Sequence, residues 1–159
     1  MIKIGDTIEQ STLKIMGKSG PESFELPAQL LNKKVIIFAV PGAFTPTCSA
    51  AHLPGFVANH QALTAAGVDM IACVSVNDAF VMHAWGESAN AQNITMLADG
   101  NATFTQAIGL DKDATKFHMG VRSKRYAMVI DNAVVTHLVI DESGLELTSA
   151  DALLAHLTQ

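Results

Sequence analysis

The amino-acid sequence predicts a single three-layer α/β domain with a mixed central sheet over residues 1–159. Residues 34–40 and 70–76 are apolar and β-branched on both faces, as expected of central parallel strands that helices cover on both sides. The stretch between them, residues 48–66, has the length and composition of a helix, so the three segments match one βαβ crossover. With 49% hydrophobic residues and no long Pro, Gly or Ser linker, the chain suits one packed domain.

The remaining elements continue the alternation of strand and helix. We expect helices at residues 78–91, 102–108 and 149–158, strands at residues 94–98, 125–131 and 133–140, and a small hairpin around residues 12–16 and 24–26. Asp131 and Asn132 form a two-residue hairpin signal between the last two strands.

Composition and charge exclude several classes of function. Ten Lys and Arg against fifteen Asp and Glu leave a net charge of −5, which offers no footprint for nucleic acid or an acidic membrane surface. The longest aliphatic run, residues 35–40, falls far short of the ~20 residues of a membrane span, and the N-terminus lacks the apolar core of a secretory signal. Two cysteines are too few for a disulfide framework and lack the paired spacing of a zinc site. We therefore expect a cytoplasmic protein without metal, membrane or nucleic-acid partners.

The segment that follows the first central strand carries the candidate site. Functional groups gather at the carboxyl ends of strands in open α/β sheets, and residues 41–49 read PGAFTPTCS. Thr45 is a preferred N-cap residue and Pro46 suits the first helical position, so Cys48 falls at the third. This placement is expected to expose the sulfur at the positive end of the helix dipole. The alternative, a small buried hydrophobe, is disfavoured because the cap, the proline and the preceding turn coincide.

The sulfur of Cys48 needs a cation to act as a nucleophile, because a free thiol is mostly protonated at neutral pH. The helix dipole contributes roughly 0.3–1 kcal/mol, whereas a charge-assisted hydrogen bond contributes about 1.5–3 kcal/mol. We therefore predict an arginine beside Cys48, since a forked guanidinium can bind both the sulfur and substrate oxygens. Arg122 and Arg125, just before the strand of residues 126–130, are the candidates. A solvated surface position is the ordinary alternative for at least one of them.

Three nearby residues each have two interpretations. Pro41 either ends the strand or shields the sulfur from water. Thr45 caps the helix, and its hydroxyl can also bind the thiolate and the substrate. Cys73 lies inside a strand that is buried on both faces, and a core position is favoured.

The helix that carries Cys48 is expected to be irregular. Pro54 and Gly55 interrupt it, which predicts a kink near residues 51–54. His52 lies four residues beyond Cys48 on the same helical face, where helix packing is favoured over a role in tuning the site.

The motifs of other chemistries are missing from the sequence. It has no Gly-x-Gly-x-x-Gly, phosphate loop, His-Glu-x-x-His or nucleophile elbow. A Cys-x-x-Cys oxidoreductase needs a second cysteine where this chain has Thr45. Cofactor-free thiol chemistry at Cys48 is what remains.

Pro41-x-x-x-Thr45-x-x-Cys48 resembles the active-site motif of the peroxiredoxins. Three longer strings resemble the type-five subfamily, which includes the plant type II enzymes: PGAFTPTCSAAHLPGF (41–56), CVSVNDAFVMHAWG (73–86) and KRYAMVID (124–131). The resemblance covers nearly the whole chain. It implies a thioredoxin-like fold and reduction of hydrogen peroxide and organic hydroperoxides without a cofactor.

The resemblance also implies roles for the site residues. Cys48 would be the peroxidatic thiolate that attacks the distal peroxide oxygen and becomes a sulfenic acid. Thr45 and Arg125 would hold the thiolate and the peroxide, and Pro41 would be the shield. Arg125 is chosen over Arg122 because the family places its arginine directly before the aromatic residue that opens this strand.

One departure from the subfamily concerns the reductant. Some members carry a resolving cysteine in the C-terminal segment, but residues 144–149 contain none, and Ser149 takes that place. We expect an outside thiol to reduce the sulfenic acid, with glutathione and glutaredoxin first, thioredoxin second and Cys73 a distant third.

The family forms homodimers through the active-site side of the domain. In this chain such a dimer would place Phe44, Phe80 or Trp85 near the interface. The alternative function, from a different class, is a non-catalytic redox sensor or holdase that uses the same reactive cysteine.

Overall fold

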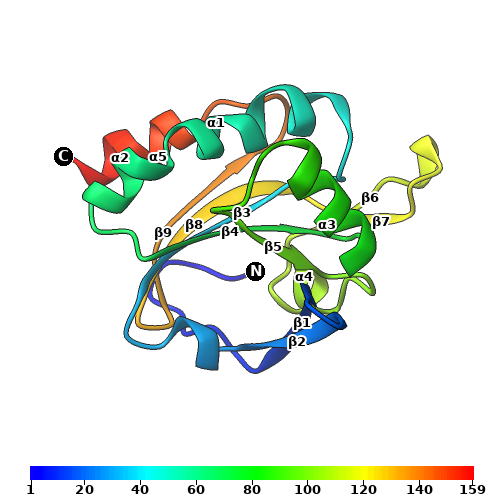
Figure 1. The fold of residues 1–159 in the computed structure, drawn as a ribbon, viewed down its shortest axis with the longest axis horizontal. Coiled ribbons are helices and arrows are strands. Elements are labelled where there is room, and N and C mark those ends of the chain that lie inside the picture. Colours follow the sequence, from blue (N-terminus) through cyan, green and yellow to red (C-terminus); the bar gives the residue numbers. More distant parts are fainter.

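The computed structural model describes all 159 residues and contains a seven-stranded mixed sheet between helices (Figure 1). The strands are β1 (Ser11–Gly17), β2 (Gly20–Leu26), β3 (Lys34–Ala39), β4 (Met70–Ser75), β5 (Thr95–Ala98), β6 (Asp111–Asp113), β7 (Val121–Ser123), β8 (Arg125–Asp131) and β9 (Val134–Asp141). The helices are a π-helical turn (Cys48–His52), α1 (Leu53–Ala58), α2 (His60–Ala65), α3 (Ala79–Ser88), α4 (Thr103–Ala107) and α5 (Ala150–Leu157), with short 3₁₀ turns at Ala28–Leu30 and Thr115–Phe117.

The strand order of the sheet is β2-β1-β5-β4-β3-β8-β9. The central strands β3, β4 and β5 are parallel, whereas β8 and β9 on one side and β1 and β2 on the other are antiparallel. In both β3 and β4, every residue after the first is buried, as the β-branched sequences of these strands predict. The expected thioredoxin-like fold with a mixed sheet is confirmed.

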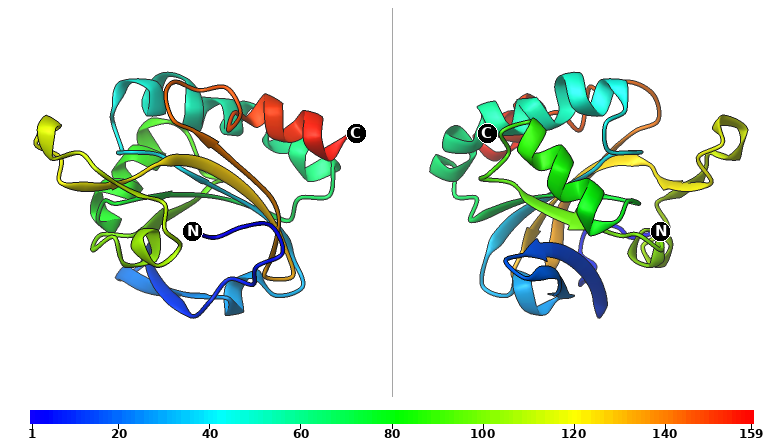
Figure 2. Two further views of the ribbon diagram at one scale, coloured as in Figure 1. Left: turned by 180° about the vertical axis from the view of Figure 1, so that it is seen from behind. Right: turned by 45° about the vertical axis from the view of Figure 1, so that its right-hand side comes forward.

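The two faces of the sheet carry separate apolar clusters. One face packs against α1, α2, α3 and α5, and its cluster includes Phe38, Trp85 and both cysteines. The other packs against α4 and the N-terminal segment that holds Ile2 and Ile8, with Phe104 and Tyr126 among the members of its cluster. The two views in Figure 2 show these layers on opposite sides of the sheet. No helix is both long and apolar enough to span a bilayer.

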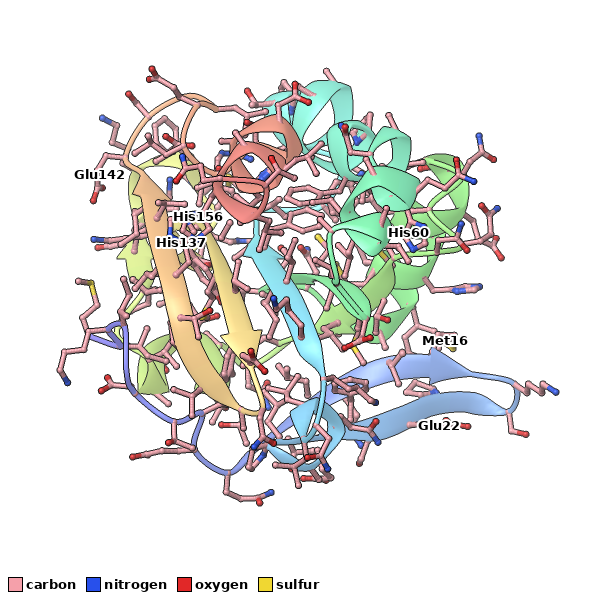
Figure 3. All side chains as sticks on the ribbon, turned by 90° about the vertical axis from the view of Figure 1, so that its left-hand side faces the viewer. Met16, Glu22, His60, His137, Glu142 and His156 are labelled. Atoms are coloured by element: carbon pink, nitrogen blue, oxygen red, sulfur yellow. The ribbon has the colours of Figure 1, made fainter.

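The C-terminal helix α5 closes the layer over the first face. Ser149 Oγ accepts from the N–H of Ala152 at 3.1 Å and so caps the helix, a common role of serine at this position. The rings of His137 in β9 and His156 in α5 stack with their centroids 3.6 Å apart, and both residues are labelled in Figure 3.

Two local expectations were wrong. The turn between β8 and β9 is Asn132-Ala133, one residue later than predicted, with φ of 48° and 68°. Both angles are positive, as a twist-matched two-residue hairpin requires, and the buried Ala133 is fixed by a bond from Ile8 N–H to its carbonyl. The β6–β7 hairpin, which forms the projecting arm in Figure 1, was not expected at all.

Candidate active site

Strand β3 delivers the segment of Cys48 to the carboxyl edge of the sheet. Helical backbone begins at Pro46, and the N–H of Ser49 donates to the Thr45 carbonyl at 2.9 Å, so Cys48 takes the predicted third position. The predicted side-chain cap is wrong, however, because the Thr45 hydroxyl donates back to the Gly42 carbonyl at 2.7 Å. The hydroxyl therefore closes the preceding loop rather than the helix.

The expected kink takes the form of a π-helical turn over Cys48–His52. The N–H of Leu53 donates to the Cys48 carbonyl five residues earlier, and α1 follows with Pro54 in its first turn. Such turns are rare and are frequently found at functional sites. Residues four apart lie on the same face of a helical turn. Cys48 and His52 can therefore reach the same partner.

That partner is Arg125, the first residue of β8. Its Nη2 donates to Cys48 Sγ at 3.3 Å, and its Nη1 contacts His52 Nδ1 at 2.7 Å. Tyr126 pairs with Ala39 at the end of β3, so Arg125 stands just past the carboxyl end of β3, where the Cys48 segment begins. Arg125 is 8% exposed. The arginine that the sequence predicts beside the sulfur is thus placed there by the sheet register.

His52 accepts a hydrogen bond from the guanidinium nitrogen of Arg125 that does not contact the sulfur. A guanidinium only donates hydrogen bonds, so Nδ1 accepts from Arg125 and Nε2–H donates to the Thr148 carbonyl at 2.9 Å. The ring packs against Phe38 and Phe56, with centroids 4.9 and 5.7 Å away. Burial, with the nearby Arg125 charge acting in the same direction, lowers the pKa of His52 to about 4. Helix packing was therefore an incomplete interpretation of His52, which is a neutral acceptor for the arginine.

Asp141, the last residue of β9, fixes the loop that contains Thr148. Its carboxylate accepts from the N–H groups of Glu146, Leu147 and Thr148 at 2.9–3.1 Å and from the Thr148 hydroxyl at 2.8 Å. Burial raises the pKa of Asp141, but these hydrogen bonds outweigh it and hold the pKa below its usual value. A chain of contacts thus runs from Asp141 through Thr148, His52 and Arg125 to the sulfur.

Cys48 itself has no exposed surface, so the expected exposure was wrong. The helix start does point the sulfur at Arg125, but Cys48 also belongs to the apolar cluster on this face of the sheet, which includes Phe38 and Ala127. Ser49 next to it accepts a hydrogen bond from Trp85 Nε1 at 3.1 Å. The sulfur is shielded from bulk water and has one charged neighbour.

The other predicted residues lie around this centre. Pro41 is half-buried and lines a small polar pocket together with Arg125. Arg122 is half-buried and does not reach the sulfur, because its guanidinium donates to the carbonyls of Met119 and Val76 at 2.8 and 3.0 Å. Cys73 is a buried free thiol whose pKa is raised by burial, which agrees with a core position.

The low pKa of His52 predicts that acid destabilises the fold. Below pH ~6.5 this histidine is protonated in the unfolded chain, but in the folded chain only below about pH 4. Unfolding therefore takes up a proton within this window, and the free energy of unfolding falls as the pH falls, by about 3 kcal/mol over the whole window. His52→Gln should flatten this slope in urea titrations between pH 7 and 4. The exposed His118→Asn should keep it, and an equal slope in both variants would contradict the burial of His52.

The chain is similar to known proteins over nearly its full length. The family model described as Redoxin matches residues 3–154. Peroxiredoxin-2E-2 of Oryza sativa subsp. japonica, described as chloroplastic, is 45% identical over 94% of this chain and 69% of its own length. The chloroplastic Peroxiredoxin-2E of Arabidopsis thaliana is 44% identical over 90% of this chain and 63% of its own. Peroxiredoxin-2C of Oryza sativa subsp. japonica is 41% identical over 98% of both chains.

Solved structures agree with this relationship. Reduced Prx3 from Vibrio vulnificus in complex with hydrogen peroxide is 52% identical over 99% of both chains, with a TM-score of 0.96. Peroxiredoxin 5 from Alvinella pompejana is 33% identical over 99% of both, with a TM-score of 0.87. The chain therefore belongs to the Redoxin family, as a peroxiredoxin of the type II subfamily, and is a thiol-dependent peroxidase.

Proposed function

We propose that Cys48 is the peroxidatic residue and that it reduces hydrogen peroxide and organic hydroperoxides. The thiolate attacks the distal oxygen, an S–O bond forms and the O–O bond breaks. The departing oxygen takes up a proton and leaves as water or alcohol, and Cys48 becomes a sulfenic acid. The observation that carries this proposal is the Arg125 fork, with one nitrogen on Cys48 Sγ and the other on His52 Nδ1.

Arg125 serves two purposes in this reaction. A charge-assisted donor on Sγ favours the anionic form of the sulfur, and the same guanidinium lies ready for the negative charge that develops on the peroxide oxygens. Because His52 is neutral and accepts from Nη1, it fixes the plane of the guanidinium without competing for the anion. Thr45 and Pro41 are assigned as peroxide partner and shield by the motif they share with the family. The half-buried position of Pro41 beside Arg125 supports its role.

An outside thiol is proposed to complete the cycle. Residues 144–149 carry no cysteine, and Ser149 is engaged in capping α5. Cys73 is fully buried and its pKa is raised by burial, which makes it a poor nucleophile toward the sulfenic acid. Glutathione with glutaredoxin is the first candidate and thioredoxin the second. Two free thiols in the folded chain fit the cytoplasmic location expected from the sequence.

The reductant is tested by supplying each one in parallel to the purified protein with excess peroxide. Sustained consumption is expected with glutathione and glutaredoxin, and slower consumption with thioredoxin. One equivalent of peroxide consumed, without turnover by either reductant, would favour the redox sensor or holdase instead.

A homodimer through the active-site side of the domain is also proposed, and two exposed aromatic residues support it. Phe44 and Phe80 are 54% and 64% exposed, so an interface over them would remove apolar surface from water. Trp85 is buried in the single chain, with its ring centroid 6.5 Å from that of Phe44, so it would lie behind such an interface rather than on its surface. Sedimentation of a monomer at micromolar concentration would remove this proposal.

A further inference from the structure

Half of the positive side chains of this acidic protein lie in one segment. The net charge is −5, yet residues 111–125 contain five of the ten Lys and Arg residues and only two carboxylates, Asp111 and Asp113. The five are Lys112, Lys116, Arg122, Lys124 and Arg125. This segment forms the β6–β7 arm (Figure 1) and leads directly into the arginine that contacts Cys48. Positive potential is therefore concentrated beside the sulfur.

A small polar pocket lies between this segment and the loop after β9. Its volume is about 100 Å³ and no large apolar side chain lines it. The lining residues are Pro41, Lys112, Lys124, Arg125, Asp141, Glu142, Ser143 and Gly144. Arg125 belongs both to the pocket and to the Cys48 contact. A group bound in the pocket would thus be separated from Cys48 Sγ by the guanidinium of Arg125.

The two carboxylates of the pocket do not neutralise its three basic side chains, Lys112, Lys124 and Arg125. Both oxygens of Asp141 are occupied by the N–H groups and hydroxyl of the following loop. Glu142 is 75% exposed, lies at the outer edge of the domain in Figure 3, and forms a long ion pair with Lys124 Nζ at 3.7 Å, which solvent screens. Lys112 makes no ion pair. The pocket therefore presents a net positive charge in a space that admits a carboxylate but excludes a lipid chain.

We propose that this pocket binds a carboxylate of the reducing thiol, so that the reductant of oxidised Cys48 is an anionic, low-molecular-weight thiol. The inference rests on the proposed function, because it requires a sulfenic acid at Cys48. The thiolate of the reductant attacks that sulfur, an S–S bond forms and the S–O bond breaks, and the hydroxyl leaves with a proton as water. A second thiol then releases the Cys48 thiol and leaves the reductant as its disulfide. Lys112 and Lys124 hold the carboxylate during the first step.

The test compares three small thiols that differ in charge: 3-mercaptopropionate, 2-mercaptoethanol and cysteamine. Each reduces protein that one equivalent of hydrogen peroxide has oxidised, and the rate is compared between variants for the same thiol. The double variant Lys112→Gln, Lys124→Gln should slow 3-mercaptopropionate about 5-fold and leave 2-mercaptoethanol unchanged. The control, Lys14→Gln with Lys18→Gln, removes the same charge from the exposed β1–β2 hairpin and should change neither rate.

The possible outcomes separate this inference from the function on which it rests. If no sulfenic acid forms at Cys48, the proposed function fails. If it forms and the pocket variant reduces at the normal rate with the anionic thiol, only the pocket inference fails. It also fails if the pocket and control variants slow the anion equally, or if the pocket variant slows all three thiols alike. Finally, slowing confined to oxidation by a carboxylate-bearing hydroperoxide would assign the pocket to the peroxide and overturn the proposal.

Discussion

Cys48→Ser is expected to abolish peroxide turnover, with a loss on the order of 10³-fold or more. A serine hydroxyl is not ionised near neutral pH, so Arg125 would have no nucleophilic anion to hold. The change removes little volume from the buried cluster, and the fold should survive it. Stopped-flow fluorescence is a direct measurement, because Trp85 is the only tryptophan and its Nε1 donates to Ser49 beside the reacting residue.

The matched control is the other cysteine. Cys73 lies in the same apolar cluster and is equally buried, so Cys73→Ala tests whether thiol loss in this core matters in itself. It should retain most of the peroxide rate and most of the turnover with an outside thiol. Turnover by Cys48→Ser, or its loss in a stably folded Cys73→Ala protein, would contradict the assignment.

The second large effect is expected at Arg125. Arg125→Lys keeps the charge but has a single nitrogen, which cannot contact Cys48 Sγ and His52 Nδ1 together. The rate constant for peroxide should fall about 10²-fold, the scale of losing a preorganised donor at the reacting atoms. The measurement is the second-order rate of peroxide reduction, with urea unfolding at the same pH to confirm a folded protein.

Arg122→Lys provides the comparison for this prediction. Arg122 is part-buried like a site residue, yet its bonds go to the carbonyls of Met119 and Val76 rather than to the sulfur. Its conservative replacement should leave the peroxide rate near that of the wild type. If Arg125→Lys keeps more than half of the wild-type rate, charge alone suffices and the forked geometry is not what activates the site.

The central strands and the start of α3 were predictable because local sequence determines them. β3 and β4 follow from β-branched runs, and α3 begins where Asp78 accepts from Val81 N–H at 2.9 Å, as its position before an apolar helix indicates. The β6–β7 arm gave no such signal. Its strands are three residues long and largely exposed, so they have no apolar periodicity to detect.

The site was predictable only in its electrostatics. The need for a cation beside Cys48 follows from elementary energies, and the sequence offered two arginines for it. The contacts of His52 could not be predicted from local sequence, because its partners are far away along the chain. Arg125 is 73 positions from His52, and Thr148 is 96 positions from it. The four-residue spacing from Cys48 to His52 was the available signal. The burial of Cys48 depends on how the helix packs on the sheet, which the spacing of residues does not encode.

The π-helical turn also determines how this segment tolerates changes in chain length. Cys48 and His52 lie in the same π-helical turn, and both contact the side chain of Arg125 in β8. Deleting one residue between them would restore ordinary α-helical hydrogen bonding, yet it would swing one of the two away from the guanidinium. At this point in the chain, regular α-helical hydrogen bonding is incompatible with the contacts of both Cys48 and His52 with Arg125. A shorter, more regular version of the helix would gain order at the cost of its chemistry.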